Sequence, residues 1–474
     1  MRNVTEDNAS LAIQSEYIFV LICLQVFLLA LTIFFKIWYF PILFVAVFFL
    51  LLISVFIPEI PLIAFVFITI TKQWIAEYIP VFQSIDYTIF LLIYLFLVSG
   101  IRYLIYGNSN LQPMGKFMWP IILFSLWIFI TLSYTPEFKD GLAKAVRFSI
   151  FNVSLFFLTI TLIQSIESLK RIVRIFITAA LFFALIMIYD GITNLLTGKI
   201  LLYVIRLTVL GANPIASARI FAVAFVMLFV IYYFEPQKRI KFFYLILLSL
   251  LATALIVTQS RGPLVSALGA IMVFLYFYSG KKKSIVLVTF FGVFILFLGI
   301  LLILPGNLTE RYLSLFGEKA NLSMYLGQGS GTITEAIRIE FWSRTMIHSF
   351  DSLLKFFVGH GSNAFRALFP FYTNAPYPHN IFIEILYELG AVGLILFGWH
   401  LFQITSVVKK TIKITEIEEY HLFIVFIAAA TTAFFSVMFS GDLPENRYLW
   451  LFFGLILASS RVFLGQERTN YSFL

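Results

Sequence analysis

The feature that most constrains this chain is a series of long apolar runs that follow one another from end to end. A helix needs roughly 20 apolar residues to cross the hydrocarbon core of a bilayer. Fourteen candidate runs cover residues 16–35, 38–57, 60–77, 87–106, 117–134, 146–165, 174–194, 220–234, 242–258, 262–280, 284–304, 380–404, 420–440 and 446–464. Only helices and closed barrels satisfy the backbone in lipid, and these runs are not short alternating strands. The sequence therefore predicts an all-α polytopic membrane protein with about 12–14 transmembrane helices.

Composition excludes the other broad classes of protein. Hydrophobic residues make up 61% of the 474 residues and charged residues 12%, against roughly 45–50% and about 25% in soluble domains. Too few polar side chains remain to cover a soluble globule, so soluble, nucleic-acid-binding and disordered proteins are excluded. The one cysteine, Cys23, allows neither an intrachain disulfide nor a metal site with paired thiolates.

The distribution of lysine and arginine predicts how the chain is oriented. The net charge is +9, and in a membrane protein a basic excess reports orientation and anionic lipid. Four basic connectors fall on the same side of the predicted spans: Lys170, Arg171 and Arg174; Lys238, Arg239 and Lys241; Lys281 to Lys283; and Lys409, Lys410 and Lys413. We assign this side as cytoplasmic. The opposite side, the periplasmic one in a bacterial inner membrane, then receives Arg206, Arg219, the turn at Arg261, residues 305–378 and the turn at 441–447.

The segment 305–378 is the one long predicted extramembrane piece, and it divides the chain into three parts. These are N-terminal spans (1–304), a periplasmic loop region (305–379) and C-terminal spans (380–474). Within the loop region, residues 332–350 predict an amphipathic helix of the kind that lies on a membrane surface. Thr332 or Thr334 would cap it, and its apolar side would comprise Ile333, Ile337, Phe341, Trp342 and Ile347.

Two arginines on the predicted periplasmic side are candidate phosphate ligands. Arg261 lies in a very tight turn between two spans, and Arg338 lies on the predicted helix. The planar guanidinium matches phosphate oxygens, so a fixed arginine at a membrane surface suits an anion. Snorkelling would equally explain Arg261. A solvated helix face, with Arg338 paired to Glu335 or Arg344 paired to Glu340, would explain Arg338. Arg206, Arg219, Arg344 and Arg366 are further cations on this side that would help build an anion site.

His379 stands where the long segment joins a helix. Pro378 restricts the chain before it, and Asn380 is placed to cap the helix that follows. A histidine there can titrate near neutral pH and act as a general base, or it can simply begin a helix with a backbone hydrogen bond. Glu384 and Glu388 follow on the same helix and would orient His379 or pair with arginines.

Several motifs are absent from the sequence. It has no Walker lysine loop, no glycine-rich dinucleotide fingerprint and no His-Glu-x-x-His. It has no Gly-x-Ser-x-Gly, and no Asp-x-Asp pair falls on the predicted outer face. We therefore expect neither a nucleotide, nor another cofactor, nor a metal.

At these residues the chain resembles the O-antigen ligase superfamily, which includes O-antigen polymerases of bacterial envelopes. Three patterns, within roughly residues 200–450, carry the resemblance, and a fourth segment near the end of the chain is also similar to the family's. They are Ser260-Arg261-Gly262; Arg338 with Trp342, leading to Gly359-His360-Gly361; His379-Asn380 followed by Glu384, Glu388, Leu389, Gly390 and Gly393; and Ser440 to Arg447.

The resemblance implies a lipid-linked glycan transferase. Such an enzyme takes a glycan from undecaprenyl pyrophosphate on the periplasmic face and passes it to an acceptor hydroxyl, without nucleotide or metal. Carried over by position, Arg261 and Arg338 would bind the pyrophosphate, and His379 would activate the acceptor or assist the leaving group. Arg219, Arg344, Trp342, Asn380 and Glu384 are the other expected contacts of the pyrophosphate or glycan.

Three functions remain open from the sequence. A ligase would use a sugar of lipid A–core as acceptor, and a polymerase would use a second lipid-linked repeat. The ligase is favoured because its pattern of two arginines and a histidine is filled. A lipid-linked sugar transporter would place polar groups near the bilayer midplane, whereas the charges here cluster at the predicted outer surface, with Asp190 the main partial exception.

Overall fold

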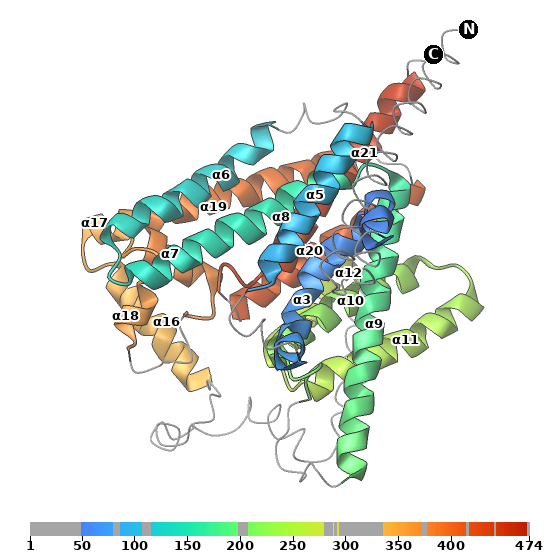
Figure 1. Cartoon of the computed structure of the whole chain (residues 1–474), viewed down its shortest axis with the longest axis horizontal. Helices are drawn as coiled ribbons and strands as arrows, with labels where there is room; N and C mark the ends of the chain where they lie inside the picture. The colour runs from blue at the N-terminus through green and yellow to red at the C-terminus, as the bar shows by residue number, and fades with distance from the viewer. Residues whose placement is uncertain are drawn as a thin grey trace, which may run out of the picture.

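The computed structural model describes residues 49–78, 86–106, 115–197, 207–278, 288, 292, 335–370, 377–413, 417–439 and 442–471. Most of these residues are helical (Figure 1). The first half contains α3 (Glu59–Tyr78), α5 (Thr88–Tyr106), α6 (Gly115–Ile130), η2 (Thr131–Tyr134), α7 (Phe138–Arg147), η3 (Phe148–Val153), α8 (Ser154–Leu162) and α9 (Ile166–Leu196). The second half contains α10 (Pro214–Phe234), α11 (Lys238–Val257), α12 (Arg261–Tyr278), α16 (Glu335–Ser349), α17 (Leu353–Val358), α18 (Phe365–Leu368), α19 (Ile381–Ile412), α20 (Ile417–Phe439) and α21 (Arg447–Tyr471).

The predicted fold class is confirmed. Within the described ranges, 10 helical segments are long and apolar enough to cross a membrane, and α12 is a shorter apolar helix. Predicted runs 16–35 and 284–304 lie outside the described residues, apart from residues 288 and 292. Run 38–57 is described only from residue 49, and residues 49–56 are helical. The chain is therefore an all-α polytopic membrane protein.

One predicted span was placed too late in the sequence. The run predicted at 146–165 belongs to a segment that begins at Phe138 and continues through α7, the π-helical η3 and α8 to Leu162. Because α7 carries several charged residues, among them Lys144, hydropathy alone did not assign its first two turns to the span. Lys144 is buried in an ion pair with acidic residues of α19, so its charge is compensated inside the bundle.

Contacts between distant segments define two ends of the bundle. At one end Arg461 donates to the Ile163 carbonyl (Nη2–O 2.7 Å), and Thr411 donates to Ser460 (Oγ1–Oγ 2.7 Å). The basic stretches at 170–174 and 409–413 belong to this end, which we call the basic end. The α6–α7 and α20–α21 connections and the start of α19 lie at the other end, which we call the His379 end. For the connectors at 170–174 and 409–413 this grouping agrees with the charge count, whereas Lys281 to Lys283 and Arg206 lie outside the described residues.

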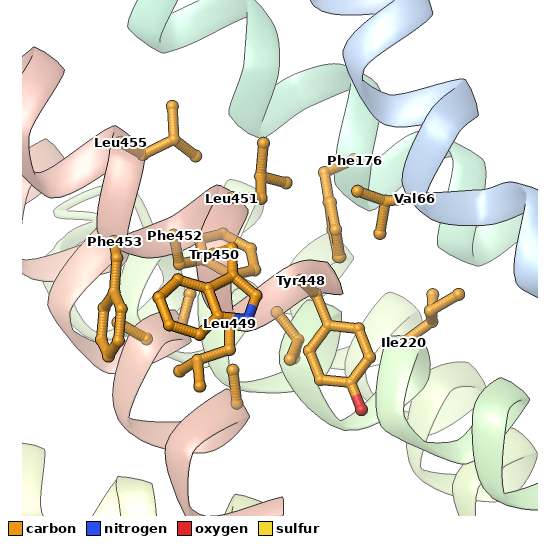
Figure 2. Close-up of a cluster of buried hydrophobic side chains, with 14 of the residues drawn as sticks. Val66, Phe176, Ile220, Tyr448, Leu449, Trp450, Leu451, Phe452, Phe453 and Leu455 are labelled. Atoms are coloured by element: carbon orange, nitrogen blue, oxygen red, sulfur yellow. The ribbon is translucent and has the colours of Figure 1, made fainter. Parts of the chain in front are cut away.

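The core is aromatic and centres on α21. Figure 2 shows its residues Tyr448 to Phe453 beside Val66 of α3, Phe176 of α9 and Ile220 of α10. Trp450 is fully buried, and its ring centroid lies 5.3 Å from that of Phe148 and 5.6 Å from that of His400. Offset and edge-on ring contacts of this kind hold helices together where water is already excluded.

Helix α19 is bent at Gly390, whose φ of 70° lies outside the helical region. A bend frees carbonyl groups in the preceding turn, and each of these needs a new donor because the site is buried. The replacement bonds run from His360 N–H to Tyr387 O (2.8 Å), from Gly361 N–H to Glu388 O (2.9 Å) and from Trp127 Nε1 to Leu389 O (2.8 Å). The first two bonds tie the long segment to α19, and the third ties α19 to α6.

The helix predicted at 332–350 is present as α16, beginning at Glu335; its predicted caps Thr332 and Thr334 lie outside the described residues. Phe341 is fully buried against Phe365 and Phe369, as its place on the apolar side predicted. The prediction was wrong for Ile347, which is 67% exposed. Six residues separate it from Phe341, which places it on another side of the helix.

Candidate functional site

His379 lies at the turn that begins α19 and is only 4% exposed. Its φ of 58° is unusual for a residue with a side chain, and such conformations persist where the surroundings enforce them, often at functional sites. Both ring nitrogens are buried, and neither has a hydrogen-bond partner among the described residues. Burial, with the positive charges of Arg338 and Arg219, lowers the pKa of His379 to about 3. The imidazole is therefore neutral at pH 7, so one ring nitrogen can accept a hydrogen bond and the other can donate one.

Helix α16 brings Arg338 and Trp342 to this turn. Residues four apart lie on the same side of a helix, and the Trp342 indole donates to the Pro378 carbonyl (Nε1–O 2.7 Å). That bond fixes the backbone immediately before His379. Arg338, one turn earlier on α16, lies close enough to lower the pKa of His379.

Helix α10 contributes Arg219, which is 3% exposed. Asn213 caps α10 by accepting from the Ile215 N–H (2.9 Å), so the helix begins earlier than the predicted residue 220 and includes Arg219. The guanidinium carbon lies 5.9 Å from the Tyr448 ring centroid. On the other side of the site, the Tyr377 ring meets His379 edge-on with centroids 4.4 Å apart. Burial raises the pKa of Tyr377.

Arg261 begins α12 in the tight turn that the sequence predicted. Gln259, in that turn, has a φ of 53° and is buried. The Thr258 side chain accepts from the Ser260 N–H (3.2 Å), which stabilises the turn. The Cβ position at Gly262 would approach Phe439 at the end of α20 (3.0 Å), so Arg261 lies at the His379 end.

Glu384 and Glu388 pair with a lysine that the sequence analysis missed. Lys144 Nζ lies 2.6 Å from Glu384 Oε1 and 2.6 Å from Glu388 Oε2. Glu388 also accepts from the Asn363 N–H (2.9 Å), and Glu384 from the Leu443 N–H (3.2 Å). The predicted pairing of these carboxylates with arginines is wrong, because the cation that reaches them is carried by α7. The cue in the sequence was a lysine just before an apolar run, matched by acids four residues apart on a distant helix.

Two further predicted site residues have identifiable partners. Asn380 caps α19, as predicted, by accepting from the N–H groups of Phe382 (3.0 Å) and Ile383 (3.2 Å). Arg344 pairs with Glu340 (2.9 Å), as the alternative interpretation of this helix expected, and its side chain is 59% exposed. A contact of either residue with substrate stays a prediction.

The structure adds the segment 442–447 to the site. The sequence analysis placed this turn on the same side as Arg261 and the long segment but assigned none of its residues a role. The pKa values of Asp442 and Glu445 are both raised, and burial is the main cause. Arg447 lies over the rings of Phe65 and Phe151, with its guanidinium carbon 5.1 and 4.8 Å from their centroids. Among the described residues, no group of three or more His, Cys, Asp or Glu has an arrangement that could hold a metal ion.

Taken together, these residues make a cationic site at one end of a membrane-embedded helical bundle. Arg219 and Arg338 surround a neutral histidine, with Arg261 at the same end. Such a set can neutralise an anionic group with fixed guanidinium groups and offer a neutral imidazole for hydrogen bonding beside it. The fold and site define a polytopic membrane protein with buried cations and a buried histidine at one end of its helical bundle.

Comparison with known families gives the particular class. Residues 245–398 match the family model described as O-antigen ligase. This match confirms the predicted resemblance to the O-antigen ligase superfamily, and it supports a membrane enzyme of the O-antigen ligase and polymerase family. The matched residues run from α11 into α19 and include Arg261, Arg338 and His379. No curated protein matches the chain.

Proposed function

We propose that this protein moves a glycan from undecaprenyl pyrophosphate to an acceptor sugar hydroxyl, most specifically as an O-antigen ligase whose acceptor is lipid A–core. The observation that carries the proposal is that the charges of Arg219 and Arg338 both act on the neutral, buried His379. Arg338 and His379 lie within the matched segment, and Arg219 precedes it in the sequence. The site would face the periplasm of the bacterial inner membrane, because the basic end is the one expected in the cytoplasm.

The arginines suit the leaving group of this reaction. Pyrophosphate gains negative charge as the glycosidic bond breaks, and fixed cations aimed at that charge stabilise the transition state. Arg261 and Arg338 are the proposed pyrophosphate ligands, with Arg219 beside them. Because pyrophosphate is already a good leaving group, no metal is needed in the proposed reaction, and attack from the opposite side would invert the anomeric centre.

The other predicted residues are given supporting roles. His379 is proposed to act beside the reacting centre, either by activating the acceptor hydroxyl or by assisting departure of the pyrophosphate. Trp342, Asn380 and Glu384 hold the turn and the helix that carry it. Arg344, exposed on α16, is a proposed contact for the glycan.

Reconstitution of the purified protein tests the proposal directly. The donor is undecaprenyl-pyrophosphate glycan, without nucleotide or added metal, and the two arms contain either lipid A–core or only more lipid-linked repeat. Glycan on lipid A–core is the expected result. A ladder growing on the lipid carrier would replace the ligase with a polymerase, and no product in either arm from folded protein would contradict a glycan transferase.

Site variants measured in the same assay test the assigned residues. Replacing one electrostatic or acid–base group at such a site lowers rates by about 10²–10⁴-fold. We expect losses of this order for Arg338→Gln and His379→Gln. Arg174→Gln is the matched control, because Arg174 is 66% exposed and paired with Glu167 at the basic end. Wild-type transfer by His379→Gln would remove His379 from the reaction.

A further inference from the structure

The segment Asp442–Asn446, between α20 and α21, is held rigidly at the His379 end. Asn152 donates to both the Leu443 and Pro444 carbonyls (3.1 Å each), and the Leu443 N–H donates to Glu384 (3.2 Å). Within the segment, Asp442 accepts from the Glu445 N–H (Oδ1, 3.0 Å) and from the Asn446 amide (backbone O, 2.5 Å). Helix α19 and the π-helical η3, with the bonds inside the segment, therefore fix the position of a short loop.

This loop presents one side chain to solvent. Leu443, Pro444 and Asn446 are buried and Asp442 is half-buried, whereas Glu445 is exposed. A rigid loop whose one exposed side chain is a carboxylate is suited to present that carboxylate to a ligand.

Glu445 belongs to the same electrostatic site as His379. The charged and titratable groups that act on Glu445 come from its own loop and from three helices: Asp442, Arg219 of α10, Arg447 of α21 and Arg147 of α7. Glu445 also interacts electrostatically with Tyr377, whose ring contacts His379, and with Tyr448, which lies beside Arg219. Although its side chain keeps accessible surface, the surrounding protein withdraws water from the carboxyl group and raises its pKa to about 7, with Asp442 adding to the rise and the three arginines opposing it.

The other candidate proton acceptors at this end are less suited to the task. Glu384 and Glu388 are 1% and 2% exposed and are held by Lys144. His379 is buried and faces Arg338 and Arg219, whose charges oppose a second positive charge on its ring. An effective general base is accessible to its substrate and has a pKa close to the working pH.

We propose that Glu445 accepts the proton of the acceptor hydroxyl, a role that rests on the proposed glycan transfer. In this step the hydroxyl O–H bond breaks and its proton passes to the Glu445 carboxylate. The hydroxyl oxygen forms a bond to the anomeric carbon of the donor, and the bond from that carbon to the pyrophosphate oxygen breaks. The electron pair of that bond leaves with the pyrophosphate, beside the arginines, where His379 serves the donor side.

The test compares Glu445→Gln with wild type across pH in the reconstituted transfer assay. Wild-type kcat/KM is expected to rise with pH through an apparent pKa near 7, because only the deprotonated carboxylate accepts a proton. Glu445→Gln is expected to lose about 10²–10⁴-fold in kcat/KM and to lose this acid limb, while still binding the lipid-linked donor. Formate added to Glu445→Ala is expected to restore part of the rate. Asp351→Asn is the matched control, since Asp351 is an exposed acid of the long segment whose carboxylate lies 3.0 Å from His348 and 3.9 Å from His360.

The outcomes separate this inference from the function on which it rests. Retention of the acid limb and of more than half the wild-type rate by Glu445→Gln would overturn the role of Glu445. Loss of donor binding together with activity, without rescue by formate, would assign Glu445 to binding and would also overturn it. Absence of transfer by the wild type in both acceptor arms would instead contradict the proposed function.

Discussion

At the residue scale, the site depends on a few side chains held in unusual conformations. His379 and Gln259 both have positive φ angles, and each stands in a turn immediately before a helix of the site. A conformation of this kind costs of order 1–3 kcal/mol per residue and persists only when neighbouring contacts enforce it. At His379 one such contact is the bond from the Trp342 indole to the Pro378 carbonyl.

Trp342→Phe tests whether this bond positions His379. An aromatic ring is kept, although a smaller one, but the indole N–H is lost, so the turn is held less firmly. We expect kcat/KM to fall about tenfold, the equivalent of a hydrogen bond contributing about 1.4 kcal/mol, with little change in thermal stability. Trp399→Phe, at a partly exposed position of α19, is the control. An unchanged kcat/KM in Trp342→Phe would show that other contacts suffice.

At the element scale, the bend in α19 connects the membrane bundle to the long segment. Gly390 and Gly359 both have positive φ angles, and their backbones touch where α17 ends. A Cβ atom at Gly390 would overlap the Phe357 carbonyl oxygen, and one at Gly359 would overlap the Glu388 carbonyl oxygen. Only glycine allows both the close approach and the backbone conformation at these two positions.

Gly390→Ala is expected to destabilise the protein by more than about 2 kcal/mol, through the strained φ and the steric overlap together. Gly398→Ala is the matched control on the same helix, because a Cβ atom there would meet nothing within 4 Å. In the control we expect no loss of stability, since alanine is the better helix former. Thermal unfolding in detergent, followed by tryptophan fluorescence, measures both variants. Equal melting temperatures would contradict the role given to the bend.

At the scale of the whole molecule, the two ends of the bundle carry different chemistry. The basic end has lysines and arginines in short connectors, including Lys409 and Lys410, which are exposed. The His379 end has cations that are buried or paired with acids, among them Lys144 and Arg219. Short basic connectors favour the cytoplasmic side, so we expect the His379 end to face the periplasm.

Cysteine labelling tests this orientation. In a Cys23→Ser background, Lys139→Cys and Lys410→Cys place single exposed thiols at opposite ends of the bundle. With a membrane-impermeant maleimide on spheroplasts, we expect labelling at position 139 before lysis and at position 410 only after it. The reverse pattern would invert the topology and would move the proposed reaction to the cytoplasmic face.

The sequence by itself determined the class of fold, the membrane spans within the described residues and several local features around His379. Membrane spans can be read from hydropathy because the cost of placing a residue in lipid depends mainly on that residue and its near neighbours. The tight turn at Arg261, the cap at Asn380 and the same-side pair Arg338 and Trp342 are also local patterns. Each of them was predicted and is present in the structure.

The tertiary structure decided which distant charges meet. Lys144 is separated from Glu384 and Glu388 by about half the chain, and α7 had to pack against α19 before the three formed one ion-paired group. The low pKa of His379 likewise arises from burial and from arginines on two other helices. Burial and long-range electrostatics depend on how helices pack, and no local pattern encodes that. A membrane chain therefore reveals its spans in its sequence, and its chemistry only when the spans are brought together.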